Sequence, residues 1–164
     1  MGDSNFINTA LLNCMVELDV QDYCNNNVDD SLLRVLNQEY SGQCSKYGYI
    51  IPNTIEIVSK PYVEFNPSNI SEANCIFNTK VKCNTIDIKR NMTFKCKVVR
   101  KVNQKALHCV PVNEDLPLDM YTFEDISSIN IDAIDIGDEV ELKVLQQPNM
   151  SKGDRRLVCV GSIL

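Results

Sequence analysis

The chain has 164 residues, of which 44% are hydrophobic and 23% are charged, so it can bury a core and is not a disordered protein. Its formal net charge of −6 excludes a uniformly basic protein that would adhere to any polyanion, and it contains no apolar run as long as a membrane span. The opening residues lack the basic and apolar stretches of a secretory signal peptide, and we expect an intracellular location.

The first elements are a strand and a helix. Residues 8–19 are apolar with interspersed polar positions and predict a strand. After a polar stretch, apolar side chains recur at helical spacing, namely Leu32, Leu33, Leu36 and Tyr40. The pattern predicts an amphipathic helix over 31–40, with Asp29 or Asp30 as the N-cap and Gly42 at its end.

Extended chain follows. Residues 47–58 are predicted to be extended, and Pro52 in their middle indicates an edge or a bulge. Residues 75–83 alternate between inward and outward positions, with Ile76 as the one apolar side chain on the polar side, which is typical of a strand with one buried face.

Beyond residue 88 strands dominate. Residues 92–102 predict a long strand in which the pair Val98-Val99 breaks the alternation as a β-bulge would, and residues 107–112 predict a second. The region 113–138 is acidic, contains no basic residue, and is interpreted as a solvated insertion. Strands are predicted again after Gly137-Asp138 and over 156–163. Residues 89–164 therefore predict an antiparallel barrel of about five strands, the size of an OB-fold.

The eight cysteines are spread along the chain without a C-x-x-C pair, and the single His108 stands beside Cys109. Zinc sites need paired ligands at short spacing, so we predict no metal site. Several cysteines fall on the inward positions of predicted strands, where a reduced thiol behaves as a small apolar side chain, and we expect a reducing compartment. No glycine-rich phosphate loop and no Ser/Cys–His–Asp arrangement is present, so we predict no catalytic residue and no cofactor.

Charge is strongly segregated. Nine of the sixteen basic residues lie between Lys80 and Lys105, where Asp87 is the only acid, so this segment carries +8 while the segment on each side carries −7. In an OB-fold, the loops joining strands 1–2 and 4–5 and the face of strands 2–3 bind oligonucleotides. We expect the basic residues at these loops to converge on one rim and bind RNA phosphates. The predicted RNA-binding residues are Lys95, Lys97, Arg100, Lys101, Lys105, Lys152, Arg155 and Arg156.

Four short motifs resemble, in order and spacing, the stalk subunit of multi-subunit DNA-dependent RNA polymerases, the family of the seventh subunit of eukaryotic RNA polymerase II and its archaeal counterpart. They are Ser41-Gly42-Gln43-Cys44, Lys46-Tyr47-Gly48-Tyr49-Ile50-Ile51, Cys75-Ile76-Phe77-Asn78-Thr79-Lys80-Val81 and Cys159-Val160-Gly161-Ser162-Ile163. The second is similar to the family's Gly-Tyr-Ile strand, the third to its Phe-Asn-Val-Lys-Tyr strand and the last to its closing Ile-Gly-Ser-Ile. The resemblance covers most of the chain.

The resemblance implies an α+β protein with two domains. A truncated ferredoxin-like tip domain over 1–88 would dock on the large core subunits of the polymerase, usually with a helical partner subunit. The OB-fold over 89–164 would meet single-stranded RNA, and no membrane is involved. The interface with the core or the partner would include Tyr47, Gly48, Tyr49 and Ile50, although packing inside the tip domain is the simpler alternative for these residues.

The sequence departs from the family at two places. Ile88-Lys89-Arg90-Asn91-Met92 replaces the family's Pro-Phe-x-Gly-Glu turn, and Ala106 replaces a glycine between the first two barrel strands. These departures favour a divergent version from a large DNA virus, located in cytoplasm or virion, over a cellular version in the nucleus. Two alternatives stay open. One is a free-standing OB-fold RNA-binding protein of translation or RNA metabolism, and the other is a structural adaptor whose basic stripe contacts protein.

Overall fold

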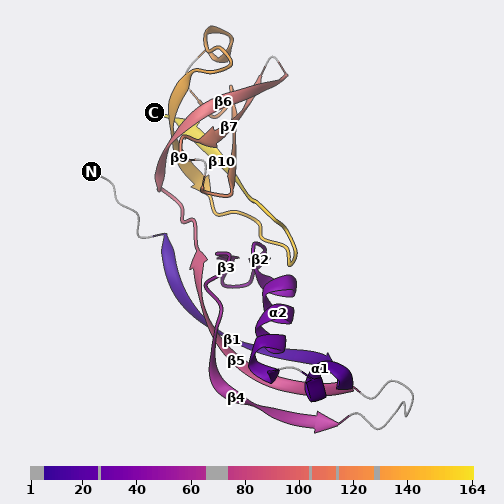
Figure 1. Cartoon of the computed structure of the whole chain (residues 1–164). Coiled ribbons are helices and arrows are strands. Elements are labelled where there is room, and N and C mark those ends of the chain that lie inside the picture. The colour runs from indigo at the N-terminus through magenta and orange to yellow at the C-terminus, as the bar shows by residue number, and fades with distance from the viewer. Residues whose placement is uncertain (1–5, 26, 66–73, 104, 114, 128–129) are drawn as a thin grey trace. The chain divides into compact units, whose positions relative to one another are not determined.

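The computed structural model describes residues 6–25, 27–65, 74–103, 105–113, 115–127 and 130–164 (Figure 1). The protein is mixed α+β and consists mostly of strands. It divides into two compact units. We call residues 7–43 with 50–86 the sheet unit, and Phe6 with residues 44–49 and 87–164 the barrel unit. The six residues 44–49, which the sequence prediction assigned to the first domain, thus belong with the barrel.

The sheet unit is built around one long central strand. β5 (Asn74–Ile86) pairs antiparallel with β1 (Ile7–Asp19) along its whole length and with β4 (Glu56–Phe65) on its other side. Alternate side chains of β1 and β5 point to one face and bury there, as the alternation of residues 75–83 predicts. The core side chains are Leu12, Cys14, Val16, Leu18, Leu32, Leu36, Ile50, Ile55, Cys75, Phe77, Val81 and Cys83.

Two helices join β1 to the rest of this unit. The short α1 (Val20–Asn25) occupies the polar stretch, and α2 (Val28–Tyr40) contributes Leu32 and Leu36 to the core. The predicted helix start at Ser31 is three residues late. Asn27 is the N-cap, because its side chain accepts a hydrogen bond from the backbone of Asp29 (3.1 Å), and the two predicted capping aspartates lie in the first turn. Gly42 follows the helix with a φ of +69°, as expected for a residue that ends a helix.

The barrel unit contains the predicted five-stranded barrel. β6 (Thr93–Asn103), β7 (Ala106–Pro111), β8 (Leu118–Phe123), β9 (Glu139–Gln146) and β10 (Leu157–Ile163) close in the order β6-β7-β8-β10-β9. All neighbouring pairs are antiparallel except β8 and β10. The barrel is OB-like. A 3₁₀ turn, Ile131–Ala133, follows β8. The hairpin of β2 (Cys44–Ser45) and β3 (Gly48–Ile50) belongs to this unit as far as Tyr49.

The third barrel strand, β8, is a strand that the sequence prediction missed. β8 lies inside the acidic region 113–138, which the prediction treated as an insertion. Leu118, Met120 and Thr122 are fully buried in it, while Asp119 and Tyr121 alternate with them toward solvent. The strand has only six residues and follows Pro117 directly, so its alternation is short and easily taken for a loop.

The predicted β-bulge in β6 is confirmed. The register with β7 shifts between Val98 and Arg100, so that Lys97 pairs with Val110 and Arg100 pairs with His108. Cys96 and Val98 point into the barrel, and without the shift Arg100 would share their face. The bulge therefore directs the Arg100 side chain outward.

The seven cysteines with described side chains are buried thiols that form no disulfide, as predicted. Burial raises the pKa of Cys96 and Cys159 to about 12 and that of Cys109 to about 11, so these thiols stay protonated at neutral pH. Within the described ranges, no three His, Cys, Asp or Glu side chains are placed to hold a metal ion. None of the described helices has the length and apolar character that crossing a membrane would require.

Candidate nucleic-acid interface

A row of side chains crosses the outer face of the barrel. The strand registers pair Arg100 of β6 with His108 of β7, His108 with Tyr121 of β8, and Tyr121 with Val160 of β10. Adjacent strands lie about 4.8 Å apart, so the row extends about 14 Å. It combines a guanidinium, two aromatic rings and an aliphatic side chain, and it includes the face of the second and third barrel strands where OB-folds bind oligonucleotides.

The two rings of this row form a stacked pair. The ring centroids of His108 and Tyr121 are 4.8 Å apart and their planes differ by 11°. Both side chains are partly exposed, and Phe123, two residues along β8, is 38% exposed. A stacked ring pair beside a cation is a surface on which a nucleobase can stack while a neighbouring phosphate meets the guanidinium.

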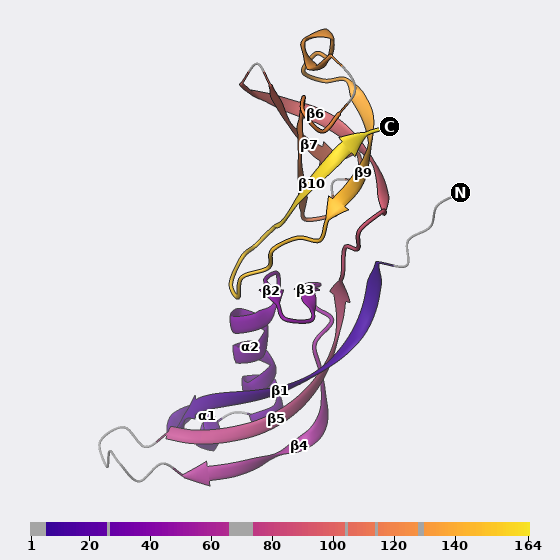
Figure 2. The ribbon, with the colours of Figure 1, turned by 180° about the vertical axis from the view of Figure 1, so that it is seen from behind.

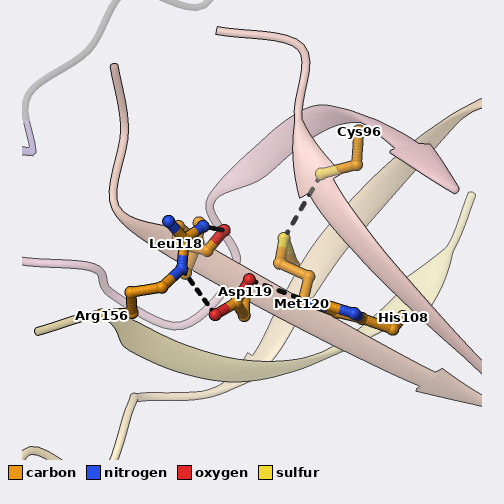
Figure 3. Close-up of polar contacts among 6 residues, drawn as sticks. All are labelled: Cys96, His108, Leu118, Asp119, Met120 and Arg156. Atoms are coloured by element: carbon orange, nitrogen blue, oxygen red, sulfur yellow. Dashed lines mark hydrogen bonds and ion pairs between the residues drawn. The ribbon is translucent and has the colours of Figure 1, made fainter. Parts of the chain in front are cut away.

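Asp119 holds His108, one ring of this pair, in place (Figure 3). His108 Nε2 lies 3.0 Å from Asp119 Oδ1, and because an ionised carboxylate only accepts, Nε2 carries the hydrogen. Arg156 donates from Nε to the other carboxylate oxygen (2.7 Å) and from Nη2 to the carbonyl of Leu118 (3.2 Å). The carboxylate thus bridges β7 and the start of β10 from its place on β8.

The pKa of Asp119 is lowered from its ordinary value. Partial burial of the carboxyl acts to raise the pKa, but the hydrogen bonds from Arg156 and His108, together with their charges, outweigh that effect. A carboxylate with a lowered folded-state pKa stabilises the fold above its ordinary pKa of about 3.9, and this contribution disappears as pH falls through the folded value.

Replacing Asp119 with Asn should therefore destabilise the barrel by about 1 kcal/mol at pH 7, with a smaller difference from the wild type at pH 3. Urea unfolding midpoints of both proteins at the two pH values measure the effect. Asp125→Asn, at an exposed position of the same barrel, is the control and should match the wild type at pH 7. A stability difference that grows toward pH 3 would contradict this role for Asp119.

The predicted RNA-binding residues are exposed or partly exposed, but several have acidic neighbours. On β6, Lys95 pairs in register with Glu141 of β9, and Lys97 pairs with Glu139. Lys101 Nζ lies 3.7 Å from a carboxylate oxygen of Asp135 and donates to the carbonyl of Asp132 (3.4 Å). Part of the positive charge of β6 is therefore neutralised within the barrel.

The predicted convergence of the two basic loops on one rim does not occur. Ala106, which follows Lys105, pairs with Phe123 at the end of β8, whereas Leu157, which follows Arg156, pairs with Leu118 at its start. The two ends of β8 are about 17 Å apart at 3.4 Å per residue. Lys105 therefore lies at one end of the barrel, and Lys152, Arg155 and Arg156 precede β10 at the other, with the stacked pair between them. Figure 1 shows β6 ending at one end of the barrel and the loop between β9 and β10 at the other.

The four residues predicted as a protein interface differ in exposure. Gly48, Tyr49 and Ile50 are buried within the chain, and Tyr47 is 42% exposed. Three of the four therefore serve packing in this structure. An interface role for this segment stays a prediction, and Tyr47 is its exposed member.

The sequence prediction missed the stacked pair and its anchor. It weighed His108 only as a catalytic or metal-binding residue. The available signal was the alternation of Asp119, Tyr121 and Phe123 against Leu118, Met120 and Thr122. Once β8 is recognised as the strand beside β7, its polar face must carry the aromatic side chains.

Comparison of the sequence with protein-family models and with curated proteins identifies no relative. No protein-family model matches the sequence, and no curated protein is similar to it.

Proposed function

We propose that this protein is a non-catalytic subunit of a DNA-dependent RNA polymerase, a stalk subunit that anchors through its sheet unit and binds single-stranded RNA with its barrel. The observation that carries the RNA-binding role is the row Arg100–His108–Tyr121–Val160 on the outer face of an OB-like barrel. RNA binding on this row is sequence-tolerant, because stacking uses a feature that every base has and the cation meets the backbone.

We infer that the sheet unit is a truncated ferredoxin-like tip domain. Its outer face is the surface that we propose anchors the protein. Ile7, Leu11 and Met15 lie four residues apart on the same outward face of β1 and are 51, 52 and 68% exposed. Beside Met15 lies a hollow of about 530 Å³ lined also by Asn78 and Lys80 of β5. Exposed apolar side chains grouped on one face mark surfaces that bind other proteins. The polymerase core, with or without a helical partner subunit, is the partner proposed for this face.

The family motifs quoted above support the same assignment by their places in the chain. Gly48-Tyr49-Ile50 forms β3, residues 75–81 lie in β5, and residues 159–163 end β10. The strand-forming parts of the resemblance are thus strands in this protein as well.

Recovery of a tagged copy from cells or particles that make the protein tests the stalk assignment. We expect the large polymerase subunits to be recovered with the wild type and to be lost with the double variant Leu11→Glu/Met15→Glu, because charge on that face opposes docking. Gln38→Glu, at an exposed position of α2, which packs on the other face of the same sheet, is the control for an added acid and should retain them. Recovery of RNA without polymerase subunits would identify a free-standing RNA-binding protein instead.

A further inference from the structure

The hairpin of β2 and β3 and the loop between β9 and β10 are held together by backbone hydrogen bonds. The Cys44 amide donates to the carbonyl of Asp154 (2.7 Å), and the Gly153 amide donates to the carbonyl of Cys44 (3.4 Å). Burial raises the pKa of the Cys44 thiol, and the thiol lies 3.9 Å from the carbonyl of Arg156. Two segments more than a hundred residues apart in sequence thus lie side by side in the barrel unit (Figure 2).

The hairpin presents Lys46 and Tyr47 at its tip. Ser45 pairs with Gly48, so these two residues form the connecting loop. The Ser45 hydroxyl accepts from the Tyr47 amide (3.1 Å) and donates to the Gly48 carbonyl (2.9 Å), which fixes the loop. Gly48 has a φ of +115°, a conformation that side chains disfavour. With Tyr49 buried beneath, the loop is a rigid support for the exposed Tyr47 ring.

Both segments carry basic residues, and one of these side chains contacts the ring. Lys46 Nζ lies 4.9 Å from the Tyr47 ring centroid. Lys46 is two residues from Cys44, and Lys152 is one residue from Gly153. The α-carbons of both basic residues therefore lie within about 8 Å of the residues that form this backbone contact. Arg155 is exposed in the same loop. The acids nearby are Asp154, whose carboxylate accepts from the Ser151 amide (3.0 Å), and Asp119, which holds Arg156.

We propose that this hairpin–loop surface, formed by Lys46, Tyr47, Lys152 and Arg155, is a second contact for single-stranded RNA. One base stacks on Tyr47, and the three basic side chains meet the adjoining phosphates. The proposal rests on the proposed function, since it extends the RNA path from the stacked pair on β7 and β8 to the end of the barrel where β8 begins. It also gives Tyr47, the exposed member of the predicted protein interface, a role in binding RNA.

The chemistry favours RNA over a folded protein at this surface. Protein interfaces have an apolar centre around an aromatic anchor, whereas the side chain recorded against the Tyr47 ring here is the basic Lys46. An exposed ring among cations is the arrangement with which proteins bind single strands without sequence preference.

The test measures affinity of the full chain for a labelled oligouridine of about 20 nucleotides, longer than one barrel covers. Tyr47→Ser should weaken binding about 5- to 20-fold without changing the salt dependence, and Tyr47→Phe should bind like the wild type because the ring is retained. Lys46→Gln/Lys152→Gln should make the slope of log affinity against log salt shallower by about 1.4. Lys80→Gln/Lys82→Gln removes the same charge from the sheet unit and should leave the slope unchanged.

Two outcomes separate this inference from the proposed function. If Tyr47→Ser binds oligouridine as tightly as the wild type, the hairpin–loop surface is not an RNA contact, while RNA binding by the barrel stands. If the wild type itself fails to bind at low salt, the proposed function is wrong and this inference falls with it. All the substituted side chains are exposed, so urea unfolding midpoints should be those of the wild type.

Discussion

The double variant Arg100→Glu/Tyr121→Ala should bind single-stranded RNA about 30- to 1000-fold more weakly than the wild type at low salt. Removal of Tyr121 eliminates a ring on which a base stacks, an interaction of about 1–3 kcal/mol, and the new acid repels a phosphate where the guanidinium attracted one. Together the two changes remove about 2–4 kcal/mol of binding free energy, which gives that range of affinities. Fluorescence anisotropy with a labelled oligouridine measures the loss.

The matched control moves the charge reversal off the barrel. Lys80→Glu/Lys82→Glu changes the net charge by more than the test variant does, at two exposed positions of β5 in the sheet unit. Both variants are also compared at about 0.1 M salt, where the Debye length is about 10 Å, and there the control should bind RNA within about twofold of the wild type if the contact is local. Equal losses for the two variants would mean that RNA responds to overall charge rather than to the row on the barrel face.

The second large effect concerns stability. Phe77→Ala should lower the free energy of unfolding of the sheet unit by about 3–5 kcal/mol. Phe77 is 1% exposed, lies on the central strand β5, and is the largest fully buried side chain among the described residues of this unit. Since a domain of this size has a stability of about 5–15 kcal/mol, the loss is a large part of the total.

Denaturant unfolding followed by circular dichroism measures that loss. The control, Leu11→Ala, removes an apolar side chain of β1 that is 52% exposed and should cost less than about 0.5 kcal/mol. A loss below about 1 kcal/mol for Phe77→Ala would show that residue 77 does not lie in a packed core.

Elements with a strong periodic pattern were predictable from the sequence. The alternation over residues 75–83 identified β5, the spacing of Leu32 and Leu36 identified α2, and the break at Val98-Val99 identified the bulge in β6. These patterns work because burial depends on the local periods of helix and strand. β8 was not predicted, because a strand of six residues after a proline gives too few repeats of the alternation between buried and exposed side chains.

The candidate site was predictable only in part. Charge segregation located the basic residues, because composition needs no knowledge of the fold. The pairing of His108 with Tyr121 depends on the register between β7 and β8, and the pairing of Lys97 with Glu139 depends on that between β6 and β9. Register arises from the closure of the whole barrel, so neither the stacked pair nor the local neutralisation of the lysines could be seen in the sequence.

The position of the hairpin tip was equally hidden. Tyr47 was expected in a separate tip domain, yet the bonds between Cys44 and the loop at Asp154 place residues 44–49 in the barrel unit. Contacts between segments so far apart in the chain leave no local signal, because they depend on the path of every element between them.

The affinity of the wild-type chain for single-stranded oligouridine as a function of salt concentration tests the central claim most directly. If about four phosphates are contacted, log affinity should fall with log salt with a slope of about −3, and binding should be measurable at low salt. Absence of binding at low salt, or binding that does not respond to salt, would contradict an RNA-binding role for the barrel.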